Sequence, residues 1–219
     1  MDDAADSLKC REEQTRRRAL LGSAPHMQPL LPLLQALRQR RGKKAVPAFD
    51  PLDGGADAAV LFLLETPGQR AVESGFISRN NPDPSARHML SMLQEARLPR
   101  QATLLWNVVP WHLNGREPRR SDLAKARKWL EKLLACLPHL EYVVLVGGHA
   151  HSMHIWLSTR TQAHILACHH PSGRSLNLDP ERRSQNIEVF AYISRRLTNS
   201  MQPAGGLRTA TGSQRSAHG

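Results

Sequence analysis

Hydrophobic residues along the chain form two kinds of pattern, short continuous runs and longer stretches with helical spacing. Four runs are apolar almost throughout and have the length of strands: 58–64, 102–109, 142–146 and 164–168. Strands that are apolar without alternation are typical of a parallel sheet covered on both faces. The runs therefore predict four buried, parallel strands.

Helical periodicity fills the segments between these runs. Apolar residues recur at spacings of three and four in 30–40, 85–96 and 180–197, and 149–157 is expected to form a short helix. A further helix is predicted to begin at Ser121, a suitable N-cap, with apolar residues following at the same spacings. The alternation of strands and helices predicts an α/β fold, a three-layer α/β/α sandwich with a central four-stranded parallel sheet.

The two ends of the chain lack this patterning. Residues 1–25 are polar with mixed charges, and residues 200–219 are rich in Gly, Ser, Ala and Arg. Both compositions are typical of flexible tails. We therefore expect one domain over 26–199, which is long enough to bury a sizeable core.

Composition excludes several classes of protein. Hydrophobic residues make up 40% of the chain, and no apolar run is long enough to cross a bilayer, so a membrane partner is not expected. The N-terminus lacks the layout of a signal peptide, which favours the cytoplasm, and we expect a monomer. The 3 cysteines are far apart in the sequence, so no disulfide scaffold, metal site or iron–sulfur cofactor is expected.

The formal net charge is +11, and much of the basic charge lies in two clusters. A basic balance suits a polyanionic partner such as DNA, because each phosphate contact releases counterions. A charged run is more often a solvated face, so the charge gains meaning only beside a site. The clusters comprise Arg38, Arg40, Arg41, Lys43 and Lys44, and then Arg116, Arg119, Arg120, Lys125, Arg127 and Lys128.

Polar or small residues follow each predicted strand. Glu65–Gly68 comes after the first strand, Asn107 lies near the end of the second, Gly147-Gly148 follows the third, and His169–Ser172 follows the fourth. Ligands of parallel α/β sheets bind at the carboxyl ends of the strands. We therefore expect these four segments to meet at one site.

Each of these residues also has a purely structural interpretation. An Asn inside an apolar strand must have its amide hydrogen-bonded, so Asn107 either ties down a loop or projects its amide into a pocket, where it could match a pyrimidine edge. His170 precedes a proline and has an extended backbone, and alone it would be an ordinary loop histidine. Phe76 is either a core residue or a platform for stacking.

Taken together, the segments resemble the uracil-DNA glycosylase superfamily over about residues 58–197. No single motif is specific, but their order, spacing and placement after successive strands are. The matching segments are Leu64–Gly68 followed by Gly75-Phe76, Asn81–Arg87, Leu105–Val109 with its asparagine, and His170–Ser175, which is similar to the family's His-Pro-Ser-Pro loop.

The resemblance implies a hydrolase of base excision repair, a DNA glycosylase that flips uracil or a related damaged base into a pocket and cleaves its N-glycosidic bond. Phe76 would stack on the base and Asn107 would hydrogen-bond to its edge. His170 would donate a hydrogen bond to the pyrimidine carbonyl as charge develops there. Ser172 would hold phosphates, and Arg174 would enter the gap that the base leaves.

The chain also departs from the best-known branch of that family. Thr66 stands where that branch has an aspartate, and threonine cannot act as a general base. Glu65, Asn81 or Asp83 would then orient the attacking water. Gly68 stands where the uracil-specific branch has a tyrosine, which predicts a wider pocket. The same resemblance places three further residues against the substrate, namely Thr66, Pro67 and Gly147.

Two alternatives stay open at this point. A glycosylase fold that binds DNA without cleaving it would account for Thr66 and for the basic clusters. An α/β enzyme acting on free nucleotides or nucleosides would share the fold class, although the chain has no P-loop and no GxGxxG motif.

Overall fold

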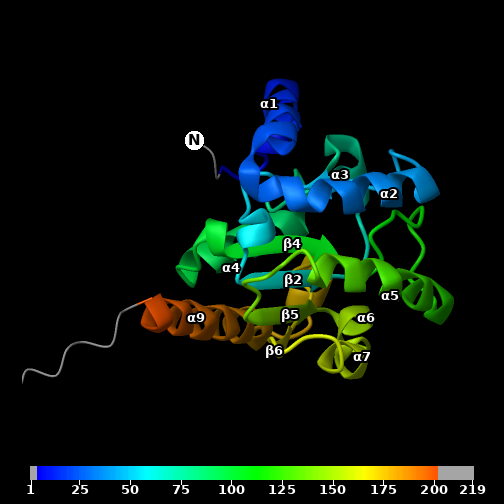
Figure 1. The fold of residues 1–219 in the computed structure, drawn as a ribbon. Coiled ribbons are helices and arrows are strands. Elements are labelled where there is room, and N and C mark those ends of the chain that lie inside the picture. The colour runs from blue at the N-terminus through cyan, green and yellow to red at the C-terminus, as the bar shows by residue number, and fades with distance from the viewer. Residues whose placement is uncertain (1–3, 202–219) are drawn as a thin grey trace, which may run out of the picture.

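The computed structural model describes residues 4–201 and contains the predicted parallel sheet (Figure 1). Its strands are β2 (Val60–Leu64), β4 (Thr103–Asn107), β5 (Tyr142–Val146) and β6 (His164–Cys168). They are ordered β4-β2-β5-β6, and every neighbouring pair is parallel. This confirms the predicted fold class, and the carboxyl ends of all four strands lie at one edge of the sheet.

Helices cover the sheet. On one side, α4 (Pro84–Glu95) packs against α9 (Glu181–Met201), and Phe190 of α9 meets Phe62 of β2 edge-on, with ring centroids 5.2 Å apart. In Figure 1, α5 (Arg120–Leu134) lies on the other side, toward the viewer. The remaining short helices are α3 (Gln69–Ser74), α6 (Gly148–His151), α7 (His154–Ser158) and α8 (Gly173–Leu176).

The predicted helices exist, with small differences at their ends. The helix predicted to begin with Ser121 as N-cap has Arg119 in that position, because the Asp122 carboxylate accepts a hydrogen bond from the Arg119 backbone N–H at 3.0 Å. The single helix predicted over 149–157 is two helices, α6 and α7, separated by a break at Ser152 and Met153.

The N-terminal segment differs from the flexible tail predicted for residues 1–25. Residues 7–30 form η1 (Ser7–Lys9), α1 (Arg11–Ser23) and η2 (Pro25–Leu30), which lead into α2 (Leu31–Arg41). Leu8, Arg17 and Leu21 are buried, and the guanidinium of Arg17 pairs with the carboxylate of Asp50. Because a buried arginine occupies the inner face of α1, this helix carries no apolar stripe that the sequence could reveal.

Short elements complete the fold. A second parallel pair joins β1 (Ala48–Phe49) to β3 (Phe76–Ile77), and 3-10 turns occur at η3 (Gly55–Asp57) and η4 (Arg100–Ala102). Within residues 4–201, none of the helices is both long enough and apolar enough to cross a bilayer. The predicted C-terminal tail lies outside the described residues except for 200 and 201, which belong to the end of α9.

Candidate active site

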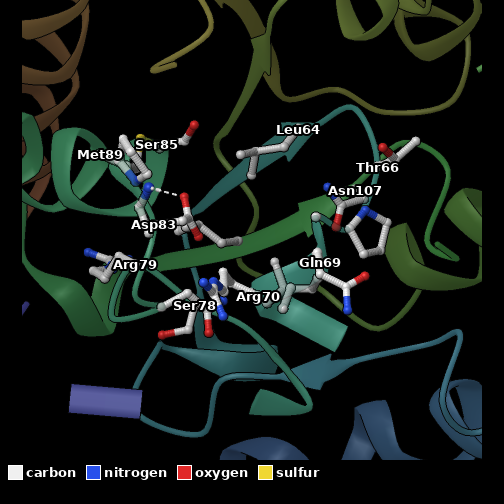
Figure 2. A pocket seen from close by; sticks show the side chains of 18 of the residues that line it. Leu64, Thr66, Gln69, Arg70, Ser78, Arg79, Asp83, Ser85, Met89 and Asn107 are labelled. Carbon is white, nitrogen blue, oxygen red and sulfur yellow. Dashed lines mark hydrogen bonds between the residues drawn. The ribbon is translucent and has the colours of Figure 1, made fainter. Parts of the chain in front are cut away.

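A cavity of about 320 Å³ opens at the carboxyl edge of the sheet (Figure 2). The ends of β2 and β4 form one part of its wall, and the first turns of α3 and α4 form another. Seven of the predicted site residues line this cavity: Thr66, Pro67, Gly68, Asn81, Asp83, Asn107 and His170. The structure therefore brings segments that are more than a hundred residues apart in the sequence to one place.

Asn107 is the last residue of β4 and lies beside Leu64, the last residue of β2. Its side chain is 2% exposed, and its Oδ1 atom accepts no hydrogen bond from the residues that the structure describes. Buried polar atoms in proteins are nearly always hydrogen-bonded, and an unsatisfied one is costly. In Figure 2 the Asn107 side chain lies at the cavity wall, so a ligand in the cavity would supply the missing partner.

The loop that carries His170 is anchored from two helices. The Asn186 amide of α9 accepts a hydrogen bond from the His169 backbone N–H at 2.8 Å and donates one to the His169 carbonyl at 3.0 Å. On the other side, Nδ1 of His88 in α4 lies 2.8 Å from the Pro171 carbonyl. These contacts fix the backbone before and after His170, which lines the cavity.

The chemical state of His170 follows from its surroundings. Its Nδ1 atom accepts a hydrogen bond from the Ser172 backbone N–H at 3.1 Å. Burial lowers the pKa of His170 below its ordinary value of 6.5, and the carboxylates of Glu65 and Asp83 oppose this shift only in part. A neutral imidazole that accepts at Nδ1 carries its proton on Nε2. His170 is therefore a neutral hydrogen-bond donor at the cavity wall.

Glu65 and Gly147 lie close to His170. The Glu65 carboxylate accepts a hydrogen bond from the His149 backbone N–H at 3.1 Å and lies 3.2 Å from Nδ1 of the same residue. Gly147 has a φ of 88°, and a Cβ there would lie 2.9 Å from the Glu65 carboxylate and 3.2 Å from Cβ of His170. Glycine at this position allows Glu65 and His170 to approach the same stretch of backbone.

Asp83 and Asn81 enter the cavity from the segment before α4. One carboxylate oxygen of Asp83 caps α4 by accepting a hydrogen bond from the Ala86 backbone N–H at 3.0 Å. The Asn81 amide is engaged at both ends, since it accepts from the Ser74 hydroxyl at 2.7 Å and donates to the Phe76 carbonyl at 2.9 Å. Asn81 therefore holds the cavity wall together, whereas Asp83 keeps a carboxylate oxygen that is not used in capping.

The Thr66–Gly68 turn separates this cavity from a second one of about 610 Å³. Glu65 lines the second cavity and not the first, together with the loop from His112 to Pro118. Nδ1 of His112 lies 2.8 Å from the Pro67 carbonyl and so ties that loop to the turn. The predicted turn thus forms a wall shared by two adjoining hollows.

Three further residues of the predicted site do not line the first cavity. Phe76 is 1% exposed in the core and does not line the cavity, whereas its neighbour Ile77 does. Successive strand residues point to opposite sides, so β3 can present only one of the two. Ser172 caps α8 and Arg174 is exposed on the same helix, and neither lines the cavity.

Sequence reasoning missed several polar residues at the site, among them Arg79 and His149. Arg79 lines the cavity although it is buried, and its guanidinium bonds to the Thr103 hydroxyl at 2.5 Å. His149, the partner of Glu65, directly follows the Gly147-Gly148 pair that the sequence analysis singled out. No local sequence pattern marks either residue, because Thr103 and Glu65, their hydrogen-bond partners, lie 24 and 84 residues away in the chain.

The described residues offer no evident metal site. Residues 4–201 contain no group of three or more His, Cys, Asp or Glu side chains placed to hold a metal ion. The three cysteines are free thiols, and burial raises the pKa of Cys168 to about 12.

Comparison with known proteins gave one clear match. The family model described as the uracil DNA glycosylase superfamily matches residues 51–193, which include both cavities and all the motifs discussed above. A search of curated proteins gave no match.

Proposed function

Since the chain belongs to the uracil DNA glycosylase superfamily, we propose that it hydrolyses the N-glycosidic bond of uracil or a related damaged base in DNA. The observation that carries the proposal is the buried Asn107 amide, whose Oδ1 lacks a partner among the described residues at the wall of the cavity. An amide has one acceptor and one donor group on a flat head. It therefore complements the N3–H donor and the O4 acceptor of uracil.

His170 supplies the second contact with the base. When the bond between C1′ and N1 breaks, its electron pair stays with the base, and negative charge develops on the pyrimidine carbonyl oxygens. In this proposal the Nε2–H of neutral His170 donates a hydrogen bond to such an oxygen, which is supported by the position of His170 in the cavity wall and by the Ser172 N–H that Nδ1 accepts. A preorganised donor stabilises charge that appears only in the transition state. The sugar meanwhile gains oxocarbenium character.

A water molecule must then attack C1′ and lose a proton. In the proposed mechanism the base occupies the first cavity and the sugar lies at the rim formed by Thr66–Gly68, a segment that also lines the second cavity. Glu65 lines that second cavity, and His149 holds only one of its carboxylate oxygens. We assign to Glu65 the orientation of the water and acceptance of its proton. The products are the free base and an abasic site.

The test is incubation of the full chain with single- and double-stranded DNA that contains uracil, followed by detection of abasic sites. Asn107→Ala and His170→Ala are expected to lose excision, and Arg195→Gln, an exposed position on α9, serves as a control that retains it. DNA binding without excision by the unsubstituted protein would favour a binding module. Release of bases from free nucleosides, but not from DNA, would favour the nucleoside enzyme.

A further inference from the structure

The two basic clusters of the sequence meet in a groove between α2 and α5. The groove encloses about 400 Å³ and is lined by Arg40 and Arg41 of α2 and by Ala124, Lys125, Lys128 and Trp129 of α5. We call these six residues the α2/α5 groove. Its lining includes four cations and no carboxylate, so the groove is suited to an anion.

The cations of the α2/α5 groove are available for binding. All four are exposed, and none of them forms an ion pair within 4.0 Å with a described carboxylate. Both acidic residues of α5 are paired with other arginines: Asp122 lies 2.7 Å from the Arg116 guanidinium, and Glu131 lies 3.0 Å from that of Arg160. Lys125 and Lys128 are one helical turn apart and share a face of α5.

Aromatic rings support the same cations. The Arg41 guanidinium carbon lies 3.7 Å from the centroid of the Trp111 ring, and the Lys128 ammonium lies 5.4 Å from that of Trp129. Contact with an aromatic face attracts a cation without neutralising it. The rings therefore hold positive charge at the groove and leave it free to meet phosphate.

The α2/α5 groove is connected to the active-site cavities. Trp111 is followed by His112, whose backbone N–H donates to the Ala45 carbonyl at 2.8 Å, just beyond α2. Nδ1 of His112 contacts Pro67 in the wall shared by the two cavities. In Figure 1 the chain from β4 to α5 passes the C-terminal end of α2. The loop that contains Trp111 and His112 thus connects the groove to the wall of the first cavity.

We infer that the α2/α5 groove binds the phosphates of the DNA strand that flanks the excised nucleotide. This inference rests on the proposed function, because the excised base, bound in the first cavity, would fix the point from which the flanking DNA strand extends. An extended strand fits better than a small anion, since four exposed cations face one another across an open groove at a distance from the reacting atoms. Each phosphate contact would release counterions and add to the salt dependence of binding.

The first experiment measures binding of fluorescein-labelled single-stranded DNA without uracil, by anisotropy over a range of salt concentrations. The variant carries Arg40→Gln, Arg41→Gln, Lys125→Gln and Lys128→Gln. Its control removes four exposed cations elsewhere, with Lys9→Gln, Arg11→Gln, Arg195→Gln and Arg196→Gln. Because a single-strand contact contributes about 0.7 to the slope of log Kd against log salt, the groove variant should lose about 2 to 3 in slope. The control should change little, and both variants should keep the melting temperature.

An equal loss of slope in the two variants would show that the salt dependence of binding reflects only the net charge of the protein, and it would overturn the inference. So would an unchanged slope in the groove variant, or tighter binding of RNA of the same sequence that depends on the groove cations. The second experiment uses uracil-containing oligonucleotides that grow by one nucleotide at a time on either side of the uracil. In the unsubstituted protein, kcat/KM should rise with length on one side, and the groove variant should lose that rise.

The two readouts separate this inference from the proposed function. If the unsubstituted protein excises no base yet binds DNA through the groove, the proposed function fails and the groove assignment stands. If it excises uracil and the groove variant shows the same length dependence, the groove assignment fails and the proposed function stands.

Discussion

The imidazole Nδ1 of His170 accepts a hydrogen bond from the backbone N–H of Ser172 at 3.1 Å. The contact is possible only while the ring is neutral, because a protonated imidazole has a donor at both nitrogens. The turn from His170 to Ser172 therefore favours the neutral imidazole, which burial favours as well. Ser172, which the resemblance assigned to phosphate, acts here through its backbone on the histidine.

His170 should make the free energy of unfolding depend on pH. Its pKa is lowered in the folded protein, so below pH 6.5 the unfolded chain takes up the proton first. The stabilisation from neutral His170 is present above pH 6.5 and is lost as pH falls toward the lowered pKa. Urea unfolding of the unsubstituted protein and of His170→Gln should show a difference in stability that declines below pH 6.5. A difference that stays constant with pH would contradict this.

Asn107 and Asn81 are both buried asparagines, and their substitution should have opposite effects on stability. Asn107→Ala removes a buried oxygen that has no partner, so the melting temperature should stay level or rise, while excision falls by about 10²- to 10³-fold. Asn81→Ala breaks the bonds to Ser74 and Phe76 and should cost about 1–3 kcal/mol. Thermal melts and single-turnover excision test both. Strong destabilisation by Asn107→Ala would assign that residue a structural role.

The proposed mechanism leaves two candidate carboxylates for orienting the water, Glu65 and Asp83, and isosteric amides distinguish them. Glu65→Gln keeps an acceptor for the His149 N–H but cannot take the proton of the water, so kcat should fall by about 10²-fold with KM nearly unchanged. Asp83→Asn keeps a good N-cap for α4 and should reduce kcat far less. Steady-state kinetics of the two variants provide the measurement. A larger loss for Asp83→Asn would transfer the role of water-orienting group to Asp83.

The sequence predicted most of the sheet and part of the site. Strands 142–146 and 164–168 were predicted to the residue, because their continuous apolar runs end at glycine or histidine. Only β5 has the predicted burial, since β6 is an edge strand in which Cys168 alone is buried. The sequence left a core position and a stacking role open for Phe76, and the structure places it in the core, because in the two-residue strand β3 only Ile77 lines the cavity. The helix α1 was missed because the buried partners of Arg17 that hold it to the domain, Asp50 and Asn80, lie 33 and 63 residues away in the chain.

Gly68 should control the size of the base that is accepted. It lines the base cavity with a φ of −76°, and a Cβ built there meets no atom within 4 Å. A side chain is therefore tolerated by the backbone and would extend into open space. Gly68→Tyr should reduce excision of 5-substituted uracils relative to uracil by about 10-fold or more, whereas Gly68→Ala should change the ratio little. If the unsubstituted protein rejects every 5-substituted uracil, the pocket is not wide.

Arg17 should be the most sensitive position of the N-terminal helix. It is 0% exposed, pairs with the equally buried Asp50, and donates to the Asn80 side chain at 3.1 Å. Arg17→Met leaves a buried carboxylate without one of its two arginine partners, since Arg100 still binds Asp50 at 2.8 Å. Loss of one partner of a buried ion pair costs about 3–5 kcal/mol, and the remaining arginine should keep the loss near the low end of that range.

The neighbouring Arg16 provides the control. It is on the same helix, but its side chain is 41% exposed, and its ion pair with Glu13 lies at the surface. An exposed pair contributes about 0–1 kcal/mol, so Arg16→Met should hardly change the midpoint of urea unfolding. Equal effects of the two substitutions would show that α1 is not held by its buried charge. Because Asn80 and Asn81 are adjacent in the cavity-lining segment, Arg17→Met should also raise KM for DNA more than Arg16→Met does.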